Sequence, residues 1–207
     1  RRVLIGWTGP GDAPVFEGHA SAQSLPRELS LGSDRALRQT FVPELQSLRG
    51  EEQRASGANT TTPMHAGLQA EVLAFLPASC GKPASECAVS VLGDGKEAAT
   101  IVTLSVDRAL VVVNATSQGN TAVRGGPLPA ADPISGGWHV HVIVDHSIVE
   151  VIVSNTTALV VYTVPTEDAG NVALIGMPED ATSAELRLWP LKNASHVYEH
   201  RHQHDGL

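Results

Sequence analysis

The stretch WHVHVIVDHSIVEVIVSN, residues 138–155, alternates valine with polar or larger side chains on both sides of His146-Ser147. Because successive side chains of a β-strand point to opposite faces, this alternation predicts two strands that each bury one face. The two residues between the strands are enough for a tight turn, so the stretch predicts a hairpin. The register puts valines opposite one another on a predicted core face: Val144 with Val149, Val142 with Val151, and Val140 with Val153.

The other face of this hairpin is mixed. It carries His141 opposite Ile152 and Ile143 opposite Glu150, with Asp145 diagonal to Glu150 at about 7–8 Å. Glycosidases use carboxylate pairs about 5–9 Å apart, so an acid/base site is one interpretation. The other is structural, because aspartate is a common turn residue and a catalytic pair needs a concave pocket. Aromatic residues make up only 4% of the chain, and sugar sites favour them, so the structural interpretation is the default.

Outward from the hairpin, similar apolar segments recur from about residue 66 to 192. Turns rich in Gly, Pro, Asn and Asp separate them, and almost no helical periodicity is present. Many short strands at this spacing predict an all-β fold, an antiparallel β-sandwich over 66–192. The predicted strands cover 68–77, 87–94, 97–107, 109–116, 138–145, 148–155, 158–165, 171–177 and 184–191.

The first part of the chain is organised differently. Two short strands are predicted, one in RVLIGW at 2–7 and one in ASAQSLPRELSL at 20–31. Residues 41–50 predict a connector helix of two to three turns, with Pro43 at its start and Gly50 just past its end.

Two polar segments complete the predicted organisation. Residues 51–66 are rich in Ala, Gly and Thr and are predicted to be a linker, and residues 193–207 a polar tail. The histidines of that tail have two interpretations, a metal site or a solvated terminus, and the second is the default. We predict no metal site and no cofactor.

Composition limits the partners. The 207-residue chain has a formal net charge of −8, which argues against nucleic acid or an anionic membrane as the main partner. No apolar run approaches the length of a membrane span. The first residue is Arg1 rather than Met, so we expect a fragment or a processed chain.

Two features predict passage through the secretory pathway. Four of the six asparagines begin an N-x-[ST] sequon, and we predict N-glycosylation at Asn59, Asn114, Asn155 and Asn193. The only two cysteines, Cys80 and Cys87, flank a short loop that a disulfide would close; free thiols or half of a metal site are the alternatives. The expected location is secreted, in a cell wall, or vacuolar.

Four stretches in order resemble landmarks of glycoside hydrolase family 32, which comprises invertases, inulinases, levanases and related fructosyltransferases. They are RRVLIGW, SLPRELSL, LRQTFVPELQSLR and VDHSIVEVIV, and the resemblance covers about residues 1–192. Matching positions with a structural role in the motifs are Trp7, Pro26, Arg27, Pro43, Glu44, Asp145, His146 and Glu150.

The resemblance implies a five-bladed β-propeller catalytic domain followed by a β-sandwich. Residues 1–40 would then be the closing propeller strands, 41–50 the connector and 66–192 the sandwich. The family's three catalytic carboxylates lie in N-terminal motifs that this sequence lacks, and Glu86 before Cys87 has the wrong context for the acid/base residue. The resemblance therefore implies no catalytic residue on this chain.

The same resemblance implies partners. A catalytic propeller chain or domain is the expected partner, with sucrose or fructan as the parent enzyme's substrate, and a homo-oligomer through the sandwich is possible within the family. The alternative is a glycosylated extracellular binding or structural module without enzymatic activity.

Overall fold

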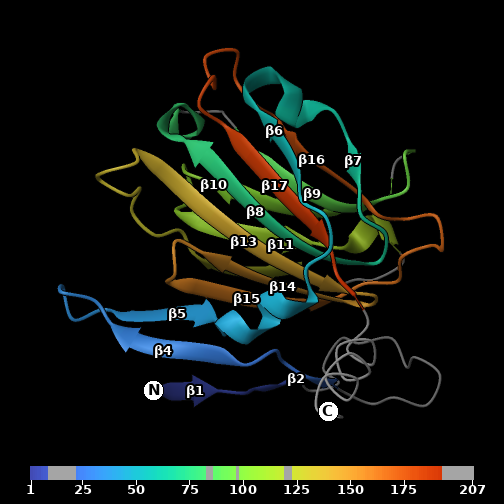
Figure 1. The fold of residues 1–207 in the computed structure, drawn as a ribbon. Helices are drawn as coiled ribbons and strands as arrows, with labels where there is room; N and C mark the ends of the chain where they lie inside the picture. Colours follow the sequence, from blue (N-terminus) through green and yellow to red (C-terminus); the bar gives the residue numbers. More distant parts are fainter. Residues whose placement is uncertain (9–21, 83–85, 97, 119–122, 193–207) are drawn as a thin grey trace, which may run out of the picture.

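The computed structural model describes residues 1–8, 22–82, 86–96, 98–118 and 123–192. Two six-stranded antiparallel sheets pack face to face and form a sandwich (Figure 1). The predicted fold class, an all-β antiparallel β-sandwich, is confirmed. All nine strands predicted in 66–192 are present, each within a few residues of its predicted bounds.

The first sheet has the order β15-β14-β13-β8-β17-β6. Its long central strands are the apolar segments recognised in the sequence. In that order the strands are Thr157–Tyr162, Ile148–Val153, Gly137–Asp145, Gln69–Pro77, Glu185–Pro190 and Gln53–Ser56.

The second sheet has the order β12-β11-β10-β9-β16-β7. In that order its strands are Val123–Pro127, Leu110–Asn114, Thr100–Ser105, Ala88–Gly93, Asn171–Ile175 and Met64–His65. Three short 3₁₀ turns join strands of the sandwich: η2 (Gly57–Thr61), η3 (Ala78–Gly81) and η4 (Thr116–Gln118).

The core between the sheets contains the predicted valine face. The β13–β14 register pairs the valines as the sequence predicted, and each of the six is at most 1% exposed. Burying a valine side chain contributes on the order of 1.5–3 kcal/mol, so this face is a major source of the sandwich's stability.

One loop at the edge of the core is closed by a disulfide. Cys80 and Cys87 are bonded, and both are fully buried. The Trp138 ring lies against this loop, since a Cβ added at Gly81 would come within 3.1 Å of it. The indole Nε1 donates a hydrogen bond to the Pro129 carbonyl at 2.9 Å.

A three-stranded sheet, β1-β4-β5, precedes the sandwich in the chain and lies beside β14 and β15 (Figure 1). Phe41 at its end packs with Ile143 and Ile152 in a second, small apolar cluster. The Gln39 amide donates a hydrogen bond to the Asn155 carbonyl at 2.7 Å. The mixed face of the hairpin is thus partly covered by this N-terminal part. Its elements are β1 (Arg2–Leu4), β2 (Trp7–Thr8), β3 (Ala22–Gln23), β4 (Arg27–Leu31) and β5 (Leu37–Phe41).

The connector differs from the predicted helix of two to three turns. Residues 37–41 form strand β5, and the helical part is a 3₁₀ segment, η1 (Pro43–Leu48). Both flanking residues, Val42 and Arg49, are extended. With extended residues at both ends, the helical part is limited to the six residues of η1.

The predicted linker at 51–66 is wrong as a description, because the structure builds it into the sandwich. Strand β6 pairs with β17 and β7 pairs with β16, each at the edge of its sheet. Edge strands are often polar and short, so a polar composition did not distinguish them from a linker.

Candidate functional site

Glu71 is the centre of a polar network on the outer face of the first sheet. Its side chain is 3% exposed and lies in β8, where it accepts hydrogen bonds from Arg49 Nε at 2.7 Å and Arg49 Nη2 at 2.6 Å. A third hydrogen bond joins it to His141 Nε2 at 2.8 Å. Burial alone would raise the pKa of Glu71, but the hydrogen bonds from Arg49 and His141 outweigh it and lower the pKa to about 2.

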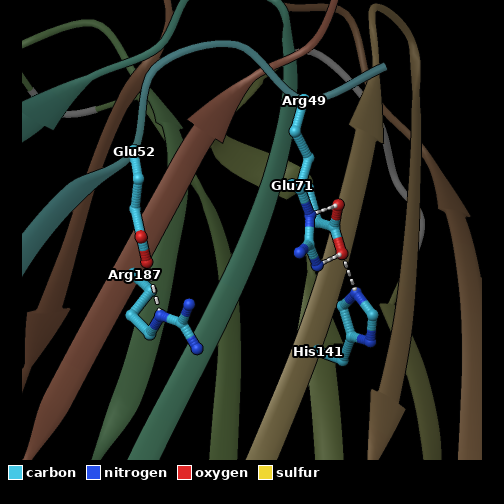
Figure 2. Close-up of polar contacts among 5 residues, drawn as sticks. All are labelled: Arg49, Glu52, Glu71, His141 and Arg187. Carbon is cyan, nitrogen blue, oxygen red and sulfur yellow. Dashed lines mark hydrogen bonds and ion pairs between the residues drawn. The ribbon is translucent and has the colours of Figure 1, made fainter. Parts of the chain in front are cut away.

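Arg49 also stacks on an indole. Its guanidinium carbon lies 4.1 Å from the Trp189 ring centroid, and that of Arg187 lies 4.8 Å from the same ring. Arg187 Nε in turn donates a hydrogen bond to Glu52 at 2.5 Å. Figure 2 shows the two ion-paired groups, one around Glu71 and one between Glu52 and Arg187.

These contacts fasten the connector to the sandwich. Arg49 follows η1 directly, and the backbone of Gly50 donates to the Pro190 carbonyl at 2.7 Å. A bidentate arginine–carboxylate pair fixes orientation as well as distance. We infer that Arg49 and Glu71 set the angle at which the N-terminal part leaves the sandwich.

A second buried carboxylate, Glu150, lies in the same cross-strand row. Trp189 pairs with Glu71, Glu71 with Ile143, and Ile143 with Glu150. We call these four residues, Trp189, Glu71, Ile143 and Glu150, the anchor row. With strands about 4.8 Å apart, the two carboxylates are attached about 10 Å apart.

Glu150 holds the N-terminal sheet as Glu71 holds the connector. The Leu25 amide donates a hydrogen bond to Glu150 Oε1 at 2.5 Å, while Oε2 and the nearby Arg27 Nε are buried without a hydrogen-bond partner among the described residues. Burial raises the pKa of Glu150, against the opposing Leu25 hydrogen bond and Arg27 charge. The two carboxylates of the anchor row therefore have pKa values shifted in opposite directions.

Replacing Glu150 by glutamine is expected to flatten the dependence of stability on pH. Because the folded-state pKa of Glu150 is raised, its contribution is fully present below the unfolded value of 4.5 and is lost as pH rises through the folded value. Between the unfolded and the folded pKa, the free energy of unfolding of the native chain should fall by up to about 1.4 kcal/mol per pH unit relative to that of Glu150→Gln. Urea unfolding at half-unit steps from pH 4 to 8 measures the difference, and parallel curves for the two proteins would contradict it.

Asp145 has different surroundings from Glu150. It is exposed at the hairpin turn, accepts a hydrogen bond from Gln69 Nε2 at 2.9 Å, and lies 3.2 Å from His146 Nδ1. The cavity lined by both carboxylates has a volume of about 30 Å³, the size of one water molecule. Ligand pockets are roughly ten times larger, so the geometry favours the structural interpretation of this pair.

The other motif positions lie along the N-terminal part. Trp7 in β2 is 70% exposed, and Arg27 Nη1 donates a hydrogen bond to Gln39 at 3.1 Å.

Pro43 begins η1, and Glu44 forms a bidentate ion pair with Arg1 that lowers the Glu44 pKa to about 2. Pro26, next to Arg27, accepts a backbone hydrogen bond from Val42 at 3.1 Å. The structure brings the motifs near Pro26 and Glu150 together through Leu25.

Three of the four sequon asparagines fall in the described residues, and all three are exposed. Asn59 lies in η2, Asn114 ends β11, and Asn155 lies in the β14–β15 turn. Asn193 and the tail histidines lie outside the described residues. Glycosylation of these positions stays a prediction.

Two kinds of site are absent from the described residues. No group of three or more His, Cys, Asp or Glu side chains in the described ranges is placed to hold a metal ion. Within the same part of the chain no helix is long and apolar enough to cross a membrane.

Sequence reasoning missed two of the four residues of the anchor row, Glu71 and Trp189. Glu71 carried a usable signal, since it is the one charged residue in the apolar segment LQAEVLAFLP and alternation places it on the face opposite Val72. Nothing local in the sequence identified Arg49 or His141 as its partners, because they lie 22 and 70 residues away.

The chain was compared with known proteins. Residues 44–190 match the family described as glycosyl hydrolases family 32 C terminal. A search of curated protein sequences gave no significant match.

Solved structures with this fold include several enzymes of sugar metabolism. An exo-inulinase from Aspergillus awamori gives a TM-score of 0.75 at 20% identity, over 92% of this chain and 40% of that one. A sucrose-6-phosphate hydrolase from Lactobacillus gasseri gives 0.72 at 19%, over 92% and 38%. A fructan 1-exohydrolase IIa from Cichorium intybus gives 0.72 at 17%, over 94% and 46%. This chain thus spans less than half the length of these neighbours.

The two-sheet sandwich of this chain is the fold of a glycosyl hydrolase C-terminal domain. With residues 44–190 matched to the family's C-terminal domain, the chain belongs to glycoside hydrolase family 32.

Proposed function

We propose that this chain is the sandwich-bearing portion of a fructosidase-type enzyme, and that it supports a catalytic β-propeller without contributing a catalytic residue. Family membership and the names of the structural neighbours, which act on inulin, fructan and sucrose-6-phosphate, support a β-fructoside as the parent's substrate. In this proposal residues 1–40 are propeller strands, and Arg49, Glu71 and Glu150 hold them against the sandwich.

The observation that carries the proposal is a set of exposed apolar side chains on both faces of the N-terminal sheet, here called the apolar N-terminal patch. Large apolar side chains that are 41–70% exposed concentrate in the first 37 residues: Val3, Leu4, Ile5, Trp7, Leu31 and Leu37. Strand β1 is also one edge of its sheet, so one side of its backbone has no strand partner among the described residues. An apolar patch beside an open strand edge fits a partner that adds strands and covers the side chains.

Capture of the companion tests this proposal. For this experiment the chain is expressed with a C-terminal tag in the organism from which it comes. The proteins that co-purify with it are then identified by their intact mass. The double variant Ile5→Ser/Leu31→Ser should reduce the recovered companion about tenfold or more, since two exposed apolar contacts contribute about 1.4 kcal/mol or more. Ile134→Ser is the matched control, because Ile134 is 95% exposed on a loop of the sandwich.

The outcome that contradicts the proposal is equally specific. A monodisperse monomer that binds little hydrophobic dye, recovered without a companion, would show that the patch needs no cover. A companion that is a second copy of this chain would instead assign the patch to a homo-oligomer.

A second candidate is a glycosylated binding module without activity, secreted or vacuolar in location. The disulfide, which persists mainly in oxidising compartments, supports the location. A groove of about 470 Å³ on the outer face of the first sheet supports a binding role. Absence of β-fructosidase activity from the tagged preparation, together with absence of a companion, would favour this candidate.

A further inference from the structure

A groove crosses the outer face of β13, β8 and β17, on the part of the sheet that the connector leaves open. Its volume is about 470 Å³, within the range of about 300–1,000 Å³ typical of ligand sites. Phe75 and His139 line it, and their ring centroids are 5.1 Å apart. Glu185 and Arg187 line the side formed by β17.

Asn155 lines the same groove and begins the sequon Asn155-Thr156-Thr157. It lies in the three-residue turn 154–156, where Ser154 and Asn155 have positive φ, 45° and 57°. Asparagine tolerates this left-handed conformation better than most residues, so the turn geometry and the glycan acceptor coincide at one position. The Asn155 side chain is exposed, and the Ser154 amide donates to the His139 carbonyl at 2.7 Å.

We propose that this groove seats the first sugars of an N-linked glycan carried by Asn155 of the same chain. The register places His139 opposite Phe75 and Phe75 opposite Glu185. At about 4.8 Å per strand, His139, Phe75 and Glu185 form a track running about 10 Å away from the turn, along the direction in which a glycan would extend.

The lining suits a sugar. The rings of Phe75 and His139 offer an apolar surface to the flat face of a sugar ring, while Glu185 and Arg187 offer a hydrogen-bond acceptor and donors to hydroxyl and acetamido groups. Because the glycan is tethered at the mouth of the groove, its local concentration is high and weak contacts are enough to hold it. In this proposal the occupant of the groove is the chain's own glycan, not a separate ligand.

Protection from an endoglycosidase tests the proposal. The full chain is expressed in a eukaryotic secretory host, and glycopeptide mass spectrometry follows each sequon during digestion of the folded protein. Release at Asn155 should be about tenfold slower than at Asn59 and Asn114, which are exposed elsewhere and serve as internal controls. That factor corresponds to about 1.4 kcal/mol of contact between sugars and groove. After denaturation the three rates should be equal.

Two variants locate the contact. His139→Ala and Phe75→Ala should raise the release rate at Asn155 to that of the other two sites, whereas His65→Ala, on the exposed histidine of β7, should leave it unchanged. Because His139 is exposed, its replacement leaves the core intact, and urea unfolding verifies this for both variants. Asn155→Asp removes the acceptor while keeping a residue that tolerates the turn.

Either of two results would overturn the proposal. One is a secreted chain modified at other sequons but not at Asn155. The other is a glycan at Asn155 released as fast as those at Asn59 and Asn114. Neither result depends on whether the chain binds a propeller, so failure here is distinguishable from failure of the proposed function.

Discussion

Glu71→Gln lowers the free energy of unfolding by about 3–5 kcal/mol, the cost expected when one partner of a buried ion pair is removed. The amide cannot accept both hydrogen bonds of the Arg49 guanidinium as a carboxylate does, and it leaves that cation against the Trp189 ring with only the weaker influence of Glu52 as counter-charge. The pKa of about 2 gives a similar magnitude, since a shift from 4.5 corresponds to about 3 kcal/mol at neutral pH. Urea unfolding at pH 7 measures the loss.

Matched variants separate charge from packing in this prediction. Glu52→Gln alters the end of the same network where the carboxylate is 25% exposed rather than 3%, so it should have a smaller effect than Glu71→Gln. The double variant Arg49→Met/Glu71→Met should recover much of the loss, because apolar groups can replace a buried pair. A Glu71→Gln protein as stable as the native chain would show that Glu71 does not anchor the connector.

The carboxylate of Glu71 also determines how the free energy of unfolding falls at acid pH. Because its folded pKa is lowered, the contribution of Glu71 is present above the unfolded value of 4.5 and is lost as pH falls towards about 2. Glu150 acts in the opposite direction, losing its contribution as pH rises. The attachment of the N-terminal part is therefore strongest just above the unfolded value, on the acid side of neutrality.

Trp138→Ala is expected to cost about 3–5 kcal/mol and to lower the melting temperature by roughly 10 °C or more. The ring is 6% exposed and fills the space between the valine face and the disulfide-closed loop. No neighbouring segment can collapse into the space, because Cys80 and Cys87 fix the loop on the other side. Calorimetry of the oxidised protein measures the change.

Trp138→Phe is the control for the indole hydrogen bond. It keeps an aromatic ring but loses the bond from Nε1 to the Pro129 carbonyl, so a smaller loss of about 1–2 kcal/mol is expected. If both substitutions cost the same, the hydrogen bond rather than the packing of the ring would be the dominant contribution.

The sequence predicted the structure best where a local pattern of side chains determines which face of a strand is buried. The valine alternation of 138–155 fixed the hairpin register, because a shift of one residue would move every valine to the other face. It failed where structure depends on a distant partner. Strand β12, VRGGP, has two glycines and a proline, and it is a strand because it pairs with β11.

In the candidate site, too, local features were predictable from the sequence and contacts between distant residues were not. Glu150 was singled out as a charge on a strand, and its acid/base interpretation was weighed against a structural one. Only the fold places it beneath Leu25 and in the same row as Glu71. A row that joins strands from distant parts of the sequence has no local pattern, which is why its role as an anchor was not predictable.

The order of strands in the first sheet has a consequence for biosynthesis. Strand β17 lies between β6 and β8, although it is made more than a hundred residues after either. During synthesis, which proceeds at about 5–20 residues per second, the facing edges of β6 and β8 remain open until residues 185–190 leave the ribosome. The sheet can close only after β17 has been synthesised, and a nascent chain stalled before that point would present two unpaired edges to chaperones or to other chains.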